Sequence, residues 1–97
     1  MGTGKKPLLV FFASARSGPC RRLESVLAHL ARKERERVSI VRIDVDEHED
    51  VAARFGIREV PTLVLVRDKR AVCRLEGRIS AARIEAAVDE HLAPARA

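Results

Sequence analysis

The sequence predicts one small α/β domain, in which four strands form a mixed sheet with helices on both faces. The chain has 97 residues, which suffices for one modest hydrophobic core and leaves no room for a second domain of useful size. Short continuous apolar runs, typical of buried strands, alternate with longer stretches of helical spacing. In chain order these segments give the pattern βαβαββα.

The domain is expected at residues 8–92, between a polar, flexible lead at residues 1–7 and a short tail at residues 93–97. Residues 8–13 form an unbroken apolar run, which predicts a strand buried on both faces. The Ser-Gly-Pro triplet that begins at Ser17 predicts a helix start, with a capping residue and a proline in the first turn. The stretch behind it carries an apolar stripe and keeps most of its arginines off that stripe, which is typical of a helix covering a sheet.

The middle of the chain predicts a parallel crossover followed by a short helix. Residues 38–45 are rich in β-branched side chains and predict the second strand, joined to the first by a right-handed connection. Asp46 is expected to cap a short helix around residues 48–55, and Gly56 to end it.

The last third predicts a hairpin and a final helix. Pro61 opens a third strand at residues 62–66, and residues 67–70 turn the chain into an antiparallel return strand at residues 71–76. Ser80 then caps the last helix, whose apolar residues recur at helical spacing.

Composition limits the classes of function. No apolar run approaches the roughly 20 residues of a membrane span. Two cysteines are too few for a disulfide framework, which favours a reducing, cytoplasmic compartment. A net charge of +5 permits acidic partners, but the mixed-sign charge runs and the lack of Tyr and Trp argue against nucleic-acid binding. His29, His48 and His91 are scattered without metal-ligand spacing, so we expect them at the surface and predict no metal and no cofactor.

Three separated motifs are similar to those of the thioredoxin family. Residues 16–20, Arg-Ser-Gly-Pro-Cys, follow the first strand, where the family carries Trp-Cys-Gly-Pro-Cys. Residues 43–47 resemble the family's stretch after the next strand, residues 55–63 resemble its segment around a cis-proline, and Gly77 resembles its glycine after the last strand. The resemblance covers about residues 8–92 and implies the minimal, glutaredoxin-like version of the fold, without the family's extra first strand and helix.

The chain departs from the family at the residues that perform thiol–disulfide exchange. In the family the first cysteine of the motif attacks a disulfide and the second resolves the mixed disulfide; here the attacking position is Ser17 and only Cys20 remains. The family's buried acid aligns with Phe11, and its two tryptophans align with Ala13 and Arg16. The resemblance therefore implies a protein that does not perform dithiol turnover.

The role of Cys20 stays open from the sequence. It lies in the first turn of a predicted helix near Arg16, Arg21 and Arg22, where the helix dipole and the positive charge favour a thiolate. It also begins the apolar stripe, and burial would raise the pKa of the thiol and make it inert. Cys73 is expected in the core as a small hydrophobic residue, with no disulfide to Cys20.

The resemblance also implies a binding groove that does not need the missing thiol. Pro61 takes the place of the family's cis-proline and leaves the backbone of Val60 free to pair with an extended peptide. The residues expected around this groove are Arg16, Ser17, Gly18, Pro19, Val60, Pro61 and Gly77.

Three functions are compatible with these residues. The first is a monomeric, non-redox or redox-impaired protein that binds a protein or thiol client in the groove around Ser17 and Pro61. The second is a thiol–disulfide oxidoreductase-like enzyme, in which Cys20 forms mixed disulfides that a small external thiol resolves. The third is a basic module that binds acidic partners. Reaction of the native protein with a disulfide reagent separates the first two, because only a reactive Cys20 is labelled without denaturation.

Overall fold

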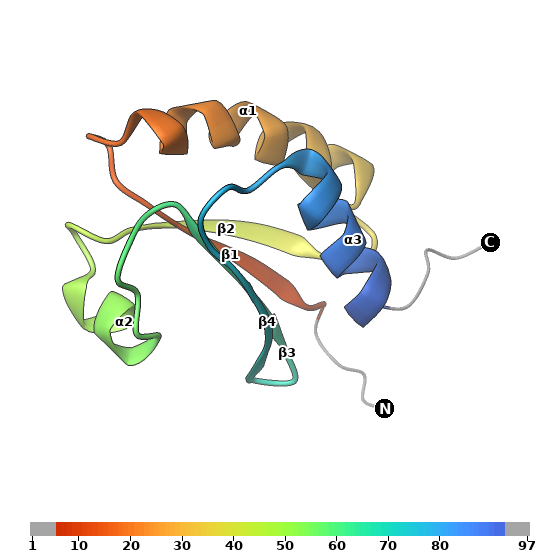
Figure 1. The fold of residues 1–97 in the computed structure, drawn as a ribbon. Coiled ribbons are helices and arrows are strands. Elements are labelled where there is room, and N and C mark those ends of the chain that lie inside the picture. Colours follow the sequence, from red (N-terminus) through yellow and green to blue (C-terminus); the bar gives the residue numbers. More distant parts are fainter. Residues whose placement is uncertain (1–5, 93–97) are drawn as a thin grey trace.

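The computed structural model describes residues 6–92, so most of the lead at 1–7 and all of the tail at 93–97 lie outside it. Within these residues the elements follow the predicted order (Figure 1). The strands are β1 (Leu8–Ala13), β2 (Ser39–Asp44), β3 (Thr62–Arg67) and β4 (Arg70–Leu75). The helices are α1 (Gly18–Lys33), α2 (Glu49–Arg54) and α3 (Ala81–His91). The predicted strand ends are therefore wrong by one residue at several places, where the chain frays into turns.

The strands form one mixed sheet in the order β2-β1-β3-β4. β1 pairs parallel with β2 and antiparallel with β3, and β3 pairs antiparallel with β4. Helices α1 and α3 cover one face of the sheet and α2 covers the other, as Figure 1 shows. This is the predicted α/β fold, with its four-stranded mixed sheet and helices on both faces.

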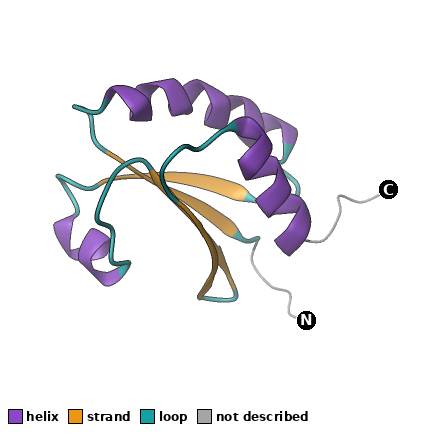
Figure 2. Ribbon diagram, in the orientation of Figure 1, coloured by secondary structure: helices purple, strands orange, loops and turns teal. Residues whose placement is uncertain are grey.

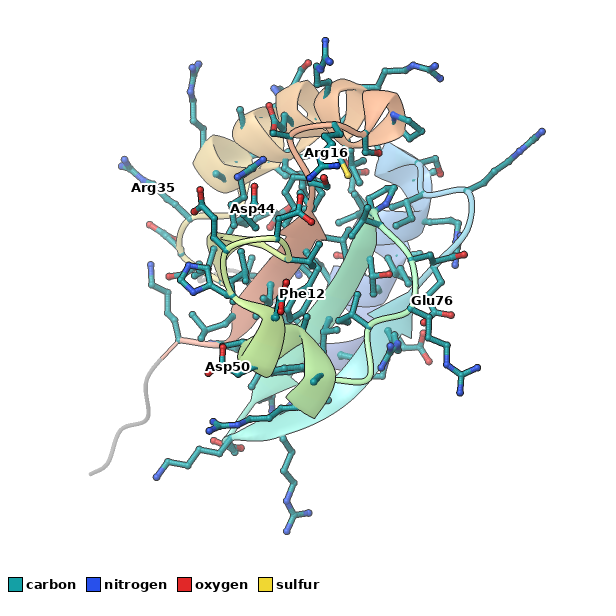
Figure 3. All side chains as sticks on the ribbon, turned by 90° about the vertical axis from the view of Figure 1, so that its left-hand side faces the viewer. Phe12, Arg16, Arg35, Asp44, Asp50 and Glu76 are labelled. Carbon is teal, nitrogen blue, oxygen red and sulfur yellow. The ribbon has the colours of Figure 1, made fainter. Side chains whose placement is uncertain are left out.

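Two hydrophobic cores lie on the two faces of the sheet. The large core joins the sheet to α1 and α3, and the small core joins it to α2. Side chains of β1 alternate between them: Leu9 and Phe11 enter the large core, whereas Val10 and Phe12 enter the small one. Figure 3 shows Phe12 between the sheet and α2, and its ring centroid lies 5.2 Å from that of Phe55. The apolar run of β1 is unbroken because both of its faces are buried.

The prediction that Asp46 caps α2 is wrong. The residue at the N-cap is His48, and its side chain makes no capping hydrogen bond. The carboxylate of Asp46 instead accepts a hydrogen bond from the Ser14 hydroxyl at 2.8 Å, and its backbone N–H donates to the Asp44 carboxylate at 2.8 Å. Asp46 lies in a turn between β2 and α2, two residues too early to reach the free N–H groups of the helix.

The hairpin between β3 and β4 is tight and irregular. Asp68 and Lys69 have positive φ angles of 53° and 66°, as a two-residue turn with the right-handed twist of its strands requires. Further along, the pairing passes from Leu65 opposite Cys73 to Val66 opposite Ala71, so one extra residue of β4 bulges out. Because the bulge changes the strand's phase, Ala71 is exposed. Cys73 lies opposite Leu65 on the side of the large core and is partly buried at its edge, less deeply than predicted.

Candidate functional site

The site is built around the first turn of α1. Ser17 is the N-cap residue, and its hydroxyl accepts a hydrogen bond from the backbone N–H of Cys20 at 3.3 Å. The N–H of Ser17 donates to the carbonyl of Ser14 at 3.1 Å, which closes the loop that leaves β1. Pro19 follows in the first turn, where its missing N–H removes no helical hydrogen bond. The Ser-Gly-Pro triplet therefore starts the helix as the sequence predicted.

Cys20 is fully buried, with 0% of its surface exposed, and it packs into the large core. Phe11 and Ala13 of β1 belong to the same core and are 2% and 0% exposed. Within residues 6–92 the buried polar or charged residues are Thr62 and Glu34, and Glu34 follows the far end of α1. At 1.5 Å per residue that end lies about 20 Å from Cys20, so no buried carboxylate adjoins the thiol. The structure thus resolves the question of the environment of Cys20 in favour of burial.

The loop between β1 and α1 is hydrogen-bonded to the turn that follows β2. The Ser14 hydroxyl accepts from the backbone N–H of Arg16 at 3.3 Å while it donates to Asp46. The side chain of Arg16 is exposed, and Figure 3 shows it close to the beginning of α1. It does not line the groove described below.

A groove of about 580 Å³ opens between the first half of α1, Pro61 and the loop that leads into α3. In Figure 2 that loop runs beside the loop leading into β3, beneath α1. The groove is lined by Pro19, Arg22, Leu23, Val26, Pro61, Gly77, Arg78, Ile79 and Ser80. The structure therefore brings together three of the residues expected from the sequence, Pro19, Pro61 and Gly77.

The other expected residues border this groove without lining it. Ser17 and Gly18 belong to the turn just before its α1 wall, and Val60 directly precedes Pro61. The Val60–Pro61 peptide bond is cis, and the side chain of Val60 packs against both cores. No backbone hydrogen bond of Val60 forms within residues 6–92. Among the described residues, its N–H and C=O therefore have no backbone partner just before β3.

The wall opposite α1 consists of residues 77–80, of which the sequence predicted only Gly77. Gly77 has a φ of +75°, and its N–H donates to the Glu59 carboxylate at 3.2 Å. The Arg83 guanidinium of α3 donates to the carbonyl of Glu76 at 3.0 Å and also to the carbonyl of Arg78. The one sequence signal for this wall was Ser80, whose predicted cap marks where the loop ends and α3 begins. The hydrogen bonds to Glu59 and from Arg83 hold the loop at residues 77–80 in place beside Pro61.

The remaining candidate residues lie away from the groove. Cys73 is a free thiol like Cys20; burial, and then the charge of Glu90, raise its pKa above the ordinary value. His29 and His48 are exposed as expected, whereas His91 is half-buried. The residues that the structure describes include no group of side chains able to hold a metal ion. Nor does any helix among residues 6–92 combine the length and apolar character needed to cross a membrane.

Comparisons with known proteins agree with this architecture. The sequence pattern of the thioredoxin family, described as Thioredoxin, matches residues 2–90. A thioredoxin of Alicyclobacillus acidocaldarius is 39% identical over 74 residues, which cover 76% of this chain and 70% of the relative. Thioredoxin 1 of Synechococcus elongatus is 33% identical over 86 residues, which cover 89% of this chain and 80% of the relative.

Solved structures give the same result. A mutant thioredoxin from Halobacterium salinarum superimposes with a TM-score of 0.81 at 32% identity, covering 89% of this chain and 74% of the other. The germline-specific thioredoxin Deadhead of Drosophila melanogaster superimposes with a TM-score of 0.83 at 28% identity, covering 89% and 81%. Fold, motif order and sequence identity agree, and the chain belongs to the thioredoxin family.

Proposed function

We propose that this member of the family binds a protein client in the groove beside Pro61 and does not reduce disulfides by dithiol turnover. The proposal rests on two side chains at the start of α1, Ser17 and Cys20. A serine hydroxyl caps the helix at the place of the attacking thiol, and Cys20 has no exposed surface.

Thiol–disulfide exchange needs two sulfur atoms in sequence. A thiolate attacks one sulfur of a disulfide and expels the other, and a second thiol then attacks the mixed disulfide and releases the reduced product. The Ser17 hydroxyl cannot form the first sulfur–sulfur bond. Phe11 has no group that could accept the proton of a resolving thiol. The first step of dithiol turnover therefore lacks its attacking thiol. For the second step the resolving thiol, Cys20, is present, but it is buried and has no proton acceptor at residue 11.

The groove supplies what a peptide-binding site needs. Its floor is apolar, formed by Leu23, Val26, Pro61 and Ile79. Beside it, the free backbone N–H and C=O of Val60 suit an extended peptide that adds main-chain hydrogen bonds at a strand end. Pockets for side chains next to a free strand end are the usual elements of this kind of recognition.

The test compares two matched variants in a binding assay with a displayed library of random octapeptides. Val26→Arg fills the groove with a charged side chain, whereas Val72→Arg places the same side chain at an exposed position on β4. We expect the wild type and Val72→Arg to enrich the same peptides and Val26→Arg to enrich none. Multiple turnovers in the reduction of insulin with a dithiol donor would contradict the proposal.

A second function is favoured by the position of Cys20 in the first turn of a helix. A single thiol at this place can attack a disulfide, expel one of its sulfur atoms and form a mixed disulfide that an external thiol then resolves. Labelling of single-cysteine variants with a disulfide reagent decides between the two. We expect Cys73→Ser, which retains only Cys20, to react after denaturation alone. Cys20→Ser, which retains Cys73, should react in the native state and faster at alkaline pH, because the pKa of Cys73 is raised. Fast native labelling of Cys20 would establish the single-thiol function instead.

A further inference from the structure

We propose that the groove selects extended acidic segments, in which one apolar side chain enters the groove and flanking carboxylates bind Arg22 and Arg78. This inference rests on the proposed function, because it names the chemistry of the client that the groove receives. It is carried by the arrangement of charge around the groove.

Arg22 and Arg78 lie on opposite walls of the groove. Arg22 comes from α1 and Arg78 from the loop that leads into α3, and the apolar floor lies between them. Both side chains are exposed, and neither forms an ion pair or a side-chain hydrogen bond within residues 6–92. A ligand with an apolar centre and negative charge on both sides matches this pattern.

The segments next to the groove add more positive charge. Arg16, Arg21 and Arg58 are also exposed and, in the part of the chain that the structure describes, have no ion-pair partner. The nearby carboxylates are already engaged: Glu59 accepts from Gly77, and Glu76 accepts from Arg74 at 2.7 Å. Glu59 and Asp46 keep their negative charges, because they accept from an N–H and a hydroxyl and form no ion pair among the described residues, but the five arginines outnumber them. An excess of positive charge therefore remains on this side and would attract an anionic partner.

The loop at residues 77–80, which carries Arg78, is held in place before any ligand binds. Arg83 donates to the carbonyls of Glu76 and Arg78, and Ser80 caps α3 by accepting from the N–H of Arg83 at 3.2 Å. Ile79, between them, packs against the large core. Because the backbone of Arg78 is fixed on both sides, binding loses less conformational entropy than it would with a free loop.

The groove favours a peptide over a nucleic acid. Two of the three Phe side chains, Phe11 and Phe12, are buried, and Phe55 packs against Phe12 in the small core. No aromatic ring is therefore presented beside the groove for a base to stack on. Its floor of aliphatic and proline side chains suits an apolar side chain of a polypeptide instead.

The test uses the peptides that the whole chain enriches from the random octapeptide library. We expect them to be acidic around one apolar residue. Replacing their Asp and Glu by Asn and Gln should weaken binding at least tenfold at low salt, and 0.5 M NaCl should remove most of that difference. Arg22→Gln and Arg78→Gln should each weaken binding of the acidic peptides three- to tenfold. Arg32→Gln removes an exposed arginine from the far end of α1 and should leave binding within twofold.

Each other outcome decides a different point. Enrichment of neutral peptides that Val26→Arg abolishes would overturn the acidic preference and leave the proposed function intact. Failure to enrich any peptide would overturn both. A single-stranded RNA oligomer that binds as tightly as the best peptide, with the same dependence on Arg22 and Arg78, would overturn the assignment of a peptide.

Discussion

Both ends of α1 carry basic side chains, but those at one end form ion pairs and those at the other end do not. At the C-terminal end Lys33 contacts Glu85 at 3.2 Å, and just beyond the helix Arg37 contacts Asp89 at 2.9 Å. These pairs connect the C-terminal end of α1 and the turn that follows it to α3 at the surface. At the N-terminal end Arg21 and Arg22 are exposed and make no such pair within residues 6–92. The positive charges at one end pair within the fold, whereas those at the other end have no ion-pair partner among the described residues and supply the charge of the proposed binding site.

The helix dipole makes this difference sharper. Cations near a helix C-terminus are favourable and cations near an N-terminus are unfavourable, by about 0.3–1 kcal/mol each at the surface. The last turn of α1 contains Arg32 and Lys33, as this effect favours, but the first turn contains no acidic residue and is followed by Arg21 and Arg22. The N-terminal end is thus arranged at some cost to stability, which a bound anion would offset.

The largest effect is expected at the paired end. Arg37 is 13% exposed and bonds to Glu34, which is 10% exposed, at 2.8 Å. Arg37→Met leaves the Glu34 carboxylate buried without its partner, so we expect the free energy of unfolding to fall by about 2–3 kcal/mol. Urea denaturation measures this loss, with Arg32→Met as the control for removing a cation from an exposed position. Equal stability of the two variants would show that the pair contributes nothing net.

A second test concerns the other face of the sheet. The Arg74 guanidinium of β4 donates to the carbonyls of Phe55 at 2.7 Å and Gly56 at 2.6 Å, and so holds the end of α2. Arg74→Met should lower the free energy of unfolding by about 1–2 kcal/mol, because charge-assisted hydrogen bonds to two backbone acceptors are lost from a partly exposed site. Amide hydrogen exchange should accelerate in α2 more than in α1. Arg70→Met, on the same strand without such contacts, is the control, and similar exchange in both variants would argue against the clamp.

The features that the sequence predicts are those encoded locally. Ser17 and Ser80 each lie at a helix start, because a hydroxyl that accepts from an N–H three residues later acts within one turn. The apolar run of β1 needs only its own composition to indicate burial on both faces. Since these signals do not depend on distant residues, the element order could be predicted.

The features that it does not predict depend on distant contacts. Arg37 and Asp89 are 52 positions apart, and nothing in the sequence distinguishes Arg37 from the unpaired Arg22. The far wall of the groove, with Arg78 and Ile79, is placed by Arg83 and Glu59 from other elements. The burial of Cys20 could not be settled because the helix dipole and the apolar stripe argue for opposite states of the same thiol.

The smallest effect compares the two serine caps. Ser17→Ala and Ser80→Ala each remove one acceptor from a helix start, and each should lower the free energy of unfolding by about 1 kcal/mol. Ser17→Ala should cost more, because the N–H of Cys20 is part-buried, whereas the N–H of Arg83 is exposed and regains a hydrogen bond from water. Urea denaturation of the two variants measures this difference.

Peptide binding gives the same pair of variants a second use. If Ser17 serves as a cap, Ser17→Ala should bind the selected peptides as tightly as the wild type while it loses stability, since its hydroxyl is engaged with the Cys20 N–H and does not line the groove. Loss of binding without loss of stability would show that the Ser17 hydroxyl contacts the peptide. The peptide-binding part of α1 would then extend back from Arg22 to Ser17.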